Sequence, residues 1–151
     1  MLRDLVLPLT GAVLLGAAVA APVAAEELGE ALFNQRCAAC HQPGGVGTPG
    51  LAPPLVNSQL WPALGDKATT YFWGVLNNGM SGTIEVDGIG YYGLVMPVQA
   101  DLSAAQMKSL AQYILHDLNG VKVTLDDAVL DKARTVPAAH TELRSLRKNG
   151  Q

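Results

Sequence analysis

Apolar side chains recur at helical spacing in three stretches of the chain, residues 26–39, 68–76 and 103–118. None of these stretches contains proline, and intervals of three and four between apolar positions are the period of an amphipathic helix. The third stretch opens with a capping box, because Ser103 stands three residues before Gln106. The pattern predicts three helices whose apolar faces cover a common core.

The segments between these helices have other patterns. Asp87-Gly88 lies between two short β-prone runs, residues 83–86 and 89–92, and this dipeptide favours the type I′ turn of a hairpin. Residues 42–54 are dense in glycine and proline, which predicts an irregular loop.

The chain becomes more charged after Gly120. Residues 125–134 and 140–148 are two short helical candidates, separated by Pro137. We expect residues 121–151 to form a C-terminal helical extension that packs over the domain, because most polar helical segments have a solvated face. A binding element is the alternative.

The first residues have the pattern of an export signal. Arg3 precedes an apolar run over residues 5–20, and small residues precede Glu26. We expect residues 1–25 to be a signal peptide that directs the protein to the periplasm, with cleavage after Ala20 as an alternative. An uncleaved membrane anchor is a further alternative, although the run is short for a bilayer span.

Residues 26–120 are enough for one domain. The formal net charge of the chain is −3, and it does not change when Arg3 and Asp4 leave with the signal peptide. This acidic balance argues against a nucleic acid as partner.

Both cysteines of the chain, Cys37 and Cys40, belong to a C-x-x-C-H motif that ends at His41. At this spacing two thiols can bond to the vinyl groups of one haem while the histidine ligates its iron. A thioredoxin-like pair would require a preceding strand, and a zinc site would require further ligands at short spacing. The other histidines, His116 and His140, are far downstream. We therefore interpret the motif as the covalent attachment site of one haem c.

The second axial ligand is specified less directly. A methionine opposite histidine suits an electron carrier and raises the reduction potential. We favour Met96, because Pro97 holds it in an extended segment just before the third helix. Met107 lies on the core face of that helix, while Met80, His116 and an open site are the alternatives.

These features resemble those of class I c-type cytochromes of the small bacterial kind, over residues 27–119. In particular, Gly29 and Phe33 together with Leu110 and Tyr113 are similar to the family's contact between its first and last helices. The resemblance implies an all-α cytochrome c fold, with three core helices around one covalent haem, a small hairpin or loop, and the C-terminal helical extension.

The resemblance also implies site residues. The stretch 50–55 is similar to the family's proline loop, which implies that the Pro53 carbonyl accepts a hydrogen bond from His41. The stretch 79–97 is similar to the segment that carries the family's methionine ligand, which adds weight to Met96. Many relatives have one residue fewer between the tyrosine and the methionine of this segment.

We expect the protein to be a periplasmic one-electron carrier, not an enzyme, that cycles a His/Met-ligated haem between Fe(III) and Fe(II). Its partners would be redox proteins, which it serves either as a free shuttle or as the cytochrome subunit of a periplasmic dehydrogenase. The alternative is a haem enzyme or gas-binding sensor with an open or displaceable sixth iron site. The apolar sequence of residues 94–98, without histidine or arginine, argues against that alternative.

Overall fold

The computed structural model describes residues 25–93, 95–122 and 124–149. The predicted signal peptide therefore lies outside the described residues, except for Ala25. Among the helices of the described part, none combines the length and the apolar character needed to span a bilayer.

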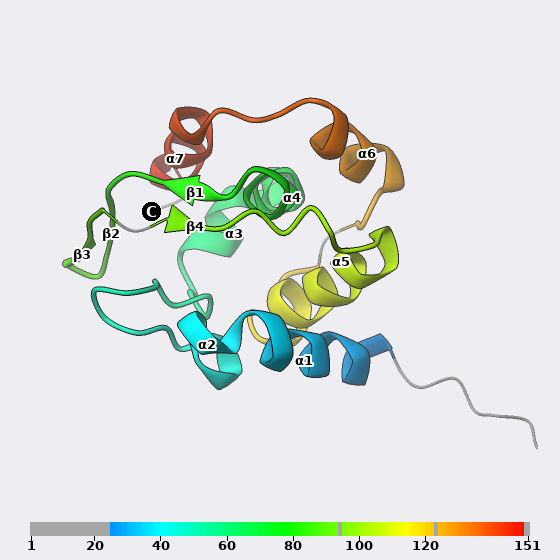
Figure 1. Cartoon of the computed structure of the whole chain (residues 1–151), viewed down its shortest axis with the longest axis horizontal. Coiled ribbons are helices and arrows are strands. Elements are labelled where there is room, and N and C mark those ends of the chain that lie inside the picture. Colours follow the sequence, from blue (N-terminus) through cyan, green and yellow to red (C-terminus); the bar gives the residue numbers. More distant parts are fainter. Residues whose placement is uncertain (1–24, 94, 123, 150–151) are drawn as a thin grey trace, which may run out of the picture.

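Helices dominate the described residues (Figure 1). The α-helices are α1 (Ala25–Arg36), α2 (Ala38–His41), α3 (Leu60–Leu64), α4 (Ala68–Asn78), α5 (Ala104–Ala111), α6 (Asp127–Thr135) and α7 (His140–Asn149). Short 3-10 turns form η1 (Pro43–Gly45) and η2 (Gly65–Lys67), and a π-helical turn, η3 (Gln112–Asp117), continues α5. Two antiparallel strand pairs lie between α4 and α5: β1 (Met80–Ser81) with β4 (Val95–Met96), and β2 (Ile84–Val86) with β3 (Ile89–Tyr91).

Helix α1 crosses α5 and η3 in close contact (Figure 1). Gly29 is the point of closest approach, because a Cβ added there would lie 2.4 Å from the carbonyl oxygen of Ser109 and 2.9 Å from Cβ of Tyr113. One turn later the ring of Phe33 packs against the ring of Tyr113, with 5.4 Å between the ring centroids. The contact predicted between the first and last helices of residues 26–120 is thus confirmed.

Local signals in the sequence predicted the turns and caps correctly. Asp87 and Gly88 have φ values of 52° and 76°, as a type I′ hairpin requires, and they join β2 to β3. The side chains of Ser103 and Gln106 form the expected reciprocal capping box at the start of α5.

Three features were not predicted. One is α3, a five-residue helix with Pro62 inside it. At its start the side-chain oxygen of Asn57 accepts from the backbone N–H groups of Gln59 and Leu60. The π-helical turn at the end of α5 was also missed. So was the pairing of β1 with β4, which brings Met80 directly opposite Met96.

The two helices expected after Gly120 form, and both pack against α4 (Figure 1). Leu130 of α6 and Leu143 of α7 are 0% and 1% exposed. Leu143 fits beside Gly74 of α4, where an added Cβ would lie 2.6 Å from its Cδ2 atom. The end of the chain therefore contributes side chains to the main hydrophobic core.

Substitution of Gly29 by alanine tests the close approach of α1 to α5. In an open helix this change would stabilise the protein by about 1 kcal/mol through helix propensity. Here we expect a loss of roughly 1–3 kcal/mol in the free energy of unfolding, because the new methyl group meets rigid backbone. Chemical denaturation of the haem-loaded protein measures the change, with exposed Glu30→Ala on the same helix as control. A stability equal to or above that of the wild type would contradict the prediction.

Candidate functional site

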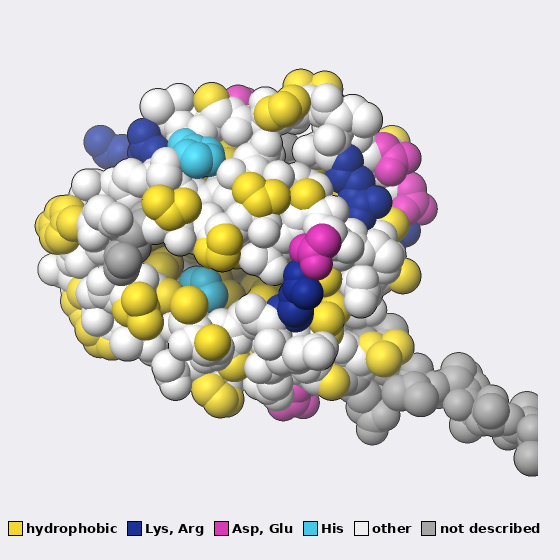
Figure 2. Space-filling model, viewed as in Figure 1, with side chains coloured by type: hydrophobic (Ala, Val, Ile, Leu, Met, Phe, Trp, Pro, Cys, Tyr) yellow, Lys and Arg dark blue, Asp and Glu magenta, His cyan; other side chains and the backbone are white. Residues whose placement is uncertain are grey.

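A deep cleft lies between α2, α4, the strand pair β1–β4 and α7. It encloses about 1310 Å³ when the part open to solvent is included. Apolar side chains form most of its walls, among them Leu55, Trp61, Phe72, Leu76 and Ile114. Figure 2 shows the surface hollowed on this face, with hydrophobic side chains around the hollow and a histidine within it.

The C-x-x-C-H motif lies at the edge of this cleft. The backbone stays helical through it, because the N–H of His41 donates to the carbonyl of Cys37 at 2.9 Å. Residues at i, i+3 and i+4 of a helix share one face, so Cys37, Cys40 and His41 all line the cleft. The thiol of Cys37 is half-buried and that of Cys40 is exposed.

His41 is only 7% exposed, and its ring is fixed by the loop that follows. Its Nδ1 atom lies 2.9 Å from the carbonyl oxygen of Pro53. Since a carbonyl oxygen can only accept, Nδ1 carries the proton and Nε2 keeps its lone pair. That tautomer is the one in which Nε2 can ligate a metal.

The pKa values of the motif suit metal ligation by histidine and do not suit a redox-active dithiol. Burial lowers the pKa of His41 below its ordinary value; the hydrogen bond to Pro53 opposes this shift and the charge of Arg147 adds to it. The ring is therefore neutral at pH 7. Burial raises the pKa of Cys37 to about 11, against the opposing charge of Arg36, whereas reactive C-x-x-C pairs have a lowered thiol pKa.

Two methionines lie side by side in the wall formed by β1 and β4. Met80 and Met96 are direct partners in the strand pair, and both line the cleft. Met80 is buried in the hydrophobic core, while Met96 is partly buried. In Figure 1 this strand pair lies in the upper part of the molecule and α2 lies in the lower part. The structure thus brings the favoured ligand Met96 and the alternative Met80 to the same cleft as His41.

The other ligand candidates lie elsewhere. His116 is exposed and hydrogen-bonded to Asp117. His140 donates from Nε2 to the carbonyl of Asn78 and accepts at Nδ1 from the hydroxyl of Ser81, so both of its ring nitrogens are engaged. Neither histidine lines the cleft, and Met107 is fully buried in the core, away from the cleft.

Sequence reasoning missed Arg147 of α7, which is 5% exposed and lines the cleft. Its Nη1 atom donates to the hydroxyl of Tyr71 at 3.3 Å. The expectation that no arginine accompanies the apolar residues 94–98 was therefore incomplete, since α7 brings one to the same cleft. A signal did exist, because Arg147 stands four residues after Leu143 and so on the apolar face of its helix.

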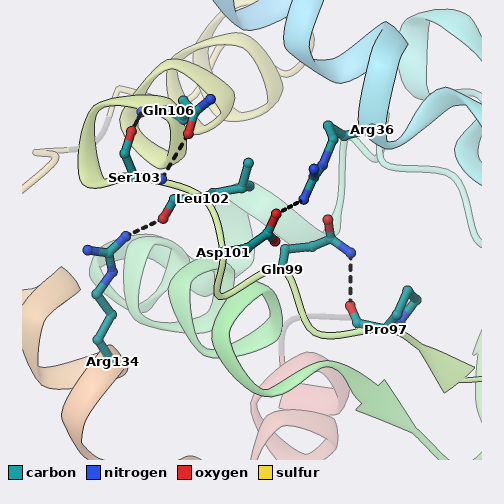
Figure 3. A network of polar contacts seen from close by, with 8 residues as sticks. All are labelled: Arg36, Pro97, Gln99, Asp101, Leu102, Ser103, Gln106 and Arg134. Carbon is teal, nitrogen blue, oxygen red and sulfur yellow. Dashed lines mark hydrogen bonds and ion pairs between the residues drawn. The ribbon is translucent and has the colours of Figure 1, made fainter.

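The segment that leads from Met96 to α5 is held by two arginines from different parts of the chain (Figure 3). Arg36, at the end of α1 and beside the motif, forms an ion pair with Asp101. Arg134 of α6 donates to the carbonyl of Leu102 at 2.5 Å. An exposed ion pair stabilises little by itself, but together these contacts fix the start of α5 relative to the cleft.

Comparison with known proteins identifies the family. Residues 24–114, more than half of the chain, match the family model described as cytochrome c oxidase, cbb3-type, subunit III. The chain belongs to the class I c-type cytochromes. As a member, this cytochrome carries covalently bound haem c, and the resemblance drawn from its sequence is confirmed.

The matches to individual relatives cover only part of each protein. The cytochrome is 35% identical over 79 residues to cytochrome c-552 of Thermus thermophilus, which is 52% of this chain and 60% of that protein. It is 36% identical over 105 residues to the cbb3-type cytochrome c oxidase subunit CcoP of Azospirillum brasilense, which is 66% of this chain and 30% of that subunit. The chain thus spans about three-fifths or less of the length of these relatives.

The residues that line the cleft of this cytochrome fit haem c in their chemistry. The two cysteine side chains and a neutral imidazole whose Nε2 can ligate iron lie at one side, and the thioether side chains of Met80 and Met96 lie in the β1–β4 wall. The apolar walls suit the macrocycle, and the buried guanidinium of Arg147 suits an anionic group. Cys37, Cys40 and His41 would attach and ligate the haem, with the Pro53 carbonyl orienting the imidazole.

Replacement of Cys37 and Cys40 by serine tests the attachment site. We expect the haem of the wild-type protein to stay with the polypeptide in acidified organic solvent and that of the double variant to be extracted, because no thioether bond remains. Each single variant should keep its haem but absorb at longer wavelength when reduced, since one vinyl group stays conjugated. Haem staining of denaturing gels and reduced spectra provide the measurements. Haem that resists extraction from the double variant would show that another side chain binds it.

Proposed function

We propose that this cytochrome is a periplasmic one-electron carrier whose haem iron is ligated by His41 and Met96. The observation that carries the proposal is the convergence of both side chains on one apolar cleft, with Nδ1 of His41 already bound to Pro53. When bound, haem c supplies the Fe(III)/Fe(II) couple.

The residues of the cleft would keep the iron environment constant between the two redox states. The Pro53 carbonyl holds the imidazole in one orientation, and burial keeps the ring neutral. The strand pair fixes the backbone of Met96 through its partner Met80. A thioether opposite imidazole favours the ferrous state and raises the reduction potential.

Exchange of electrons would take place where the cleft reaches the surface. Leu51 and Val95 line the cleft and are 44% and 65% exposed. An apolar rim of this kind suits brief docking of another redox protein. One electron would pass from a reduced partner to this cytochrome and on to an oxidised partner, and no covalent bond would be made or broken.

The partners we propose are redox proteins of the cell envelope. Similarity to a subunit of a cbb3-type oxidase favours electron exchange with a redox complex. This cytochrome would act there either as a free shuttle or as a cytochrome subunit. The catalytic subunit of a periplasmic dehydrogenase is a partner of the same class.

Substitution of Met96 by alanine tests the ligand set. In the oxidised wild type we expect the weak far-red absorption band of sulfur-to-iron ligation, and in the reduced wild type no binding of carbon monoxide. Met96→Ala should lose the band, bind carbon monoxide and shift toward the ferric state, because the thioether no longer favours Fe(II). Visible spectra and a redox titration provide these measurements.

The matched control is Met80→Ala, which removes a thioether from the directly paired position of the same wall. We expect this variant to keep the far-red band and to exclude carbon monoxide. The reverse pattern would assign ligation to Met80. Ready binding of carbon monoxide by the wild type would overturn the electron-carrier proposal in favour of a haem enzyme or gas-binding sensor.

A further inference from the structure

The end of the chain contributes a buried positive charge to the haem cleft. Arg147 is 5% exposed, and among the ion pairs of the described residues none includes it. A guanidinium stays charged at any pH a protein experiences, and a buried charge without a partner is strongly destabilising. We therefore expect an anion to bind beside Arg147 and to compensate its charge.

The unpaired atoms of Arg147 indicate the shape of that anion. Nη1 donates to the hydroxyl of Tyr71, whereas Nε and Nη2 are buried and have no hydrogen-bond partner. Nε and Nη2 lie on one edge of the guanidinium plane, and their parallel N–H bonds match the two oxygens of a carboxylate. The hydroxyl of Tyr71 accepts from Nη1 and retains its own proton, which it can donate to the same group.

We propose that Arg147, assisted by Tyr71, binds a propionate of the haem, so that the C-terminal extension forms part of the haem site. The inference rests on the proposed function in so far as the haem must occupy this cleft. The thiols that bond to the vinyl edge of the macrocycle come from α2, whereas Arg147 comes from α7, which lies apart from α2 in Figure 1. The propionates of haem are carried on the edge away from the vinyl groups.

Contacts between α7 and the rest of the protein hold Arg147 in place before any anion binds. His140 at the start of the helix bridges the hydroxyl of Ser81 and the carbonyl of Asn78. One turn later Arg144 donates to the carbonyl of Ser81. Leu143 is buried beside Gly74. The helix is thus fixed to β1 and α4, which are themselves walls of the cleft.

Pairing of Arg147 with a propionate bears on the redox equilibrium of the iron. In a cleft of low dielectric constant, loss of the guanidinium leaves the negative charge of the propionate uncompensated near the iron. An uncompensated negative charge favours Fe(III), which carries one more positive charge than Fe(II). Arg147 would therefore shift the redox equilibrium of the haem toward Fe(II).

The test compares Arg147→Gln with Lys148→Gln, which removes the same charge from the next, exposed position of α7. In spectroelectrochemical titration of the haem-loaded proteins, we expect Arg147→Gln to shift the redox equilibrium roughly tenfold toward Fe(III), which for one electron corresponds to 59 mV. Lys148→Gln should shift it less than about twofold, since salt screens exposed charges. Both variants should keep the far-red band of the wild type.

An Arg147→Gln variant whose equilibrium matches that of Lys148→Gln, with the far-red band intact, would overturn this inference and leave the electron-carrier proposal standing. A wild type without the band would overturn the His/Met proposal, and the shift in Arg147→Gln would still decide the role of the arginine.

A second measurement needs no variant and covers the case in which Arg147→Gln does not fold. The ferrous protein is diamagnetic when its iron has two strong ligands, and proton NMR can then detect contacts to the haem. We expect a nuclear Overhauser effect between the guanidinium protons of Arg147 and the methylene protons of one propionate. Contacts of those protons with Tyr71 but with no propionate would overturn the inference.

Discussion

The hydrogen bond from Nδ1 of His41 to the carbonyl of Pro53 is the interaction on which the cleft depends. It selects the tautomer and the direction of the ring, and the loop after the motif is built to supply its acceptor. Gly47, with φ at 76°, lets the loop fold back so closely that a Cβ there would lie 2.5 Å from the nitrogen of Pro54. Beyond it the carbonyl of Leu55 accepts from Trp61 and from Asn119, which ties the loop to α3 and to the residues after η3.

Structural features that depend on residues adjacent in sequence could be predicted, whereas features that depend on contacts between distant parts of the chain could not. The hairpin and the capping box of α5 follow from two or four residues, so their prediction needed no tertiary information. The motif around His41 is equally local. Pairing of Met80 with Met96, by contrast, depends on how β1 and β4 meet, and no periodicity in such short strands indicates it.

The place of Arg147 in the cleft was hidden for a different reason. Charged residues of short terminal helices usually face solvent, so the expected role of the extension was to cover the domain. The family model matches residues 24–114, so the family similarity does not extend to this arginine. The packing of Leu143 beside Gly74 shows that one face of α7 points toward the core. Arg147, four residues further along, lies on that same face.

The strand pair β1–β4 has a consequence for how this protein can vary. Because Met80 and Met96 pair directly, the residues between them form a closed loop whose two ends are fixed. Extra residues in such a loop add little entropic cost and leave the position of Met96 unchanged. The tip of the β2–β3 hairpin, with exposed Ile89, can thus change in length or composition between homologues, whereas Ile84 and Tyr91 of the same hairpin line the cleft. The surface at the tip of this hairpin is in this way free to evolve separately from the position of Met96.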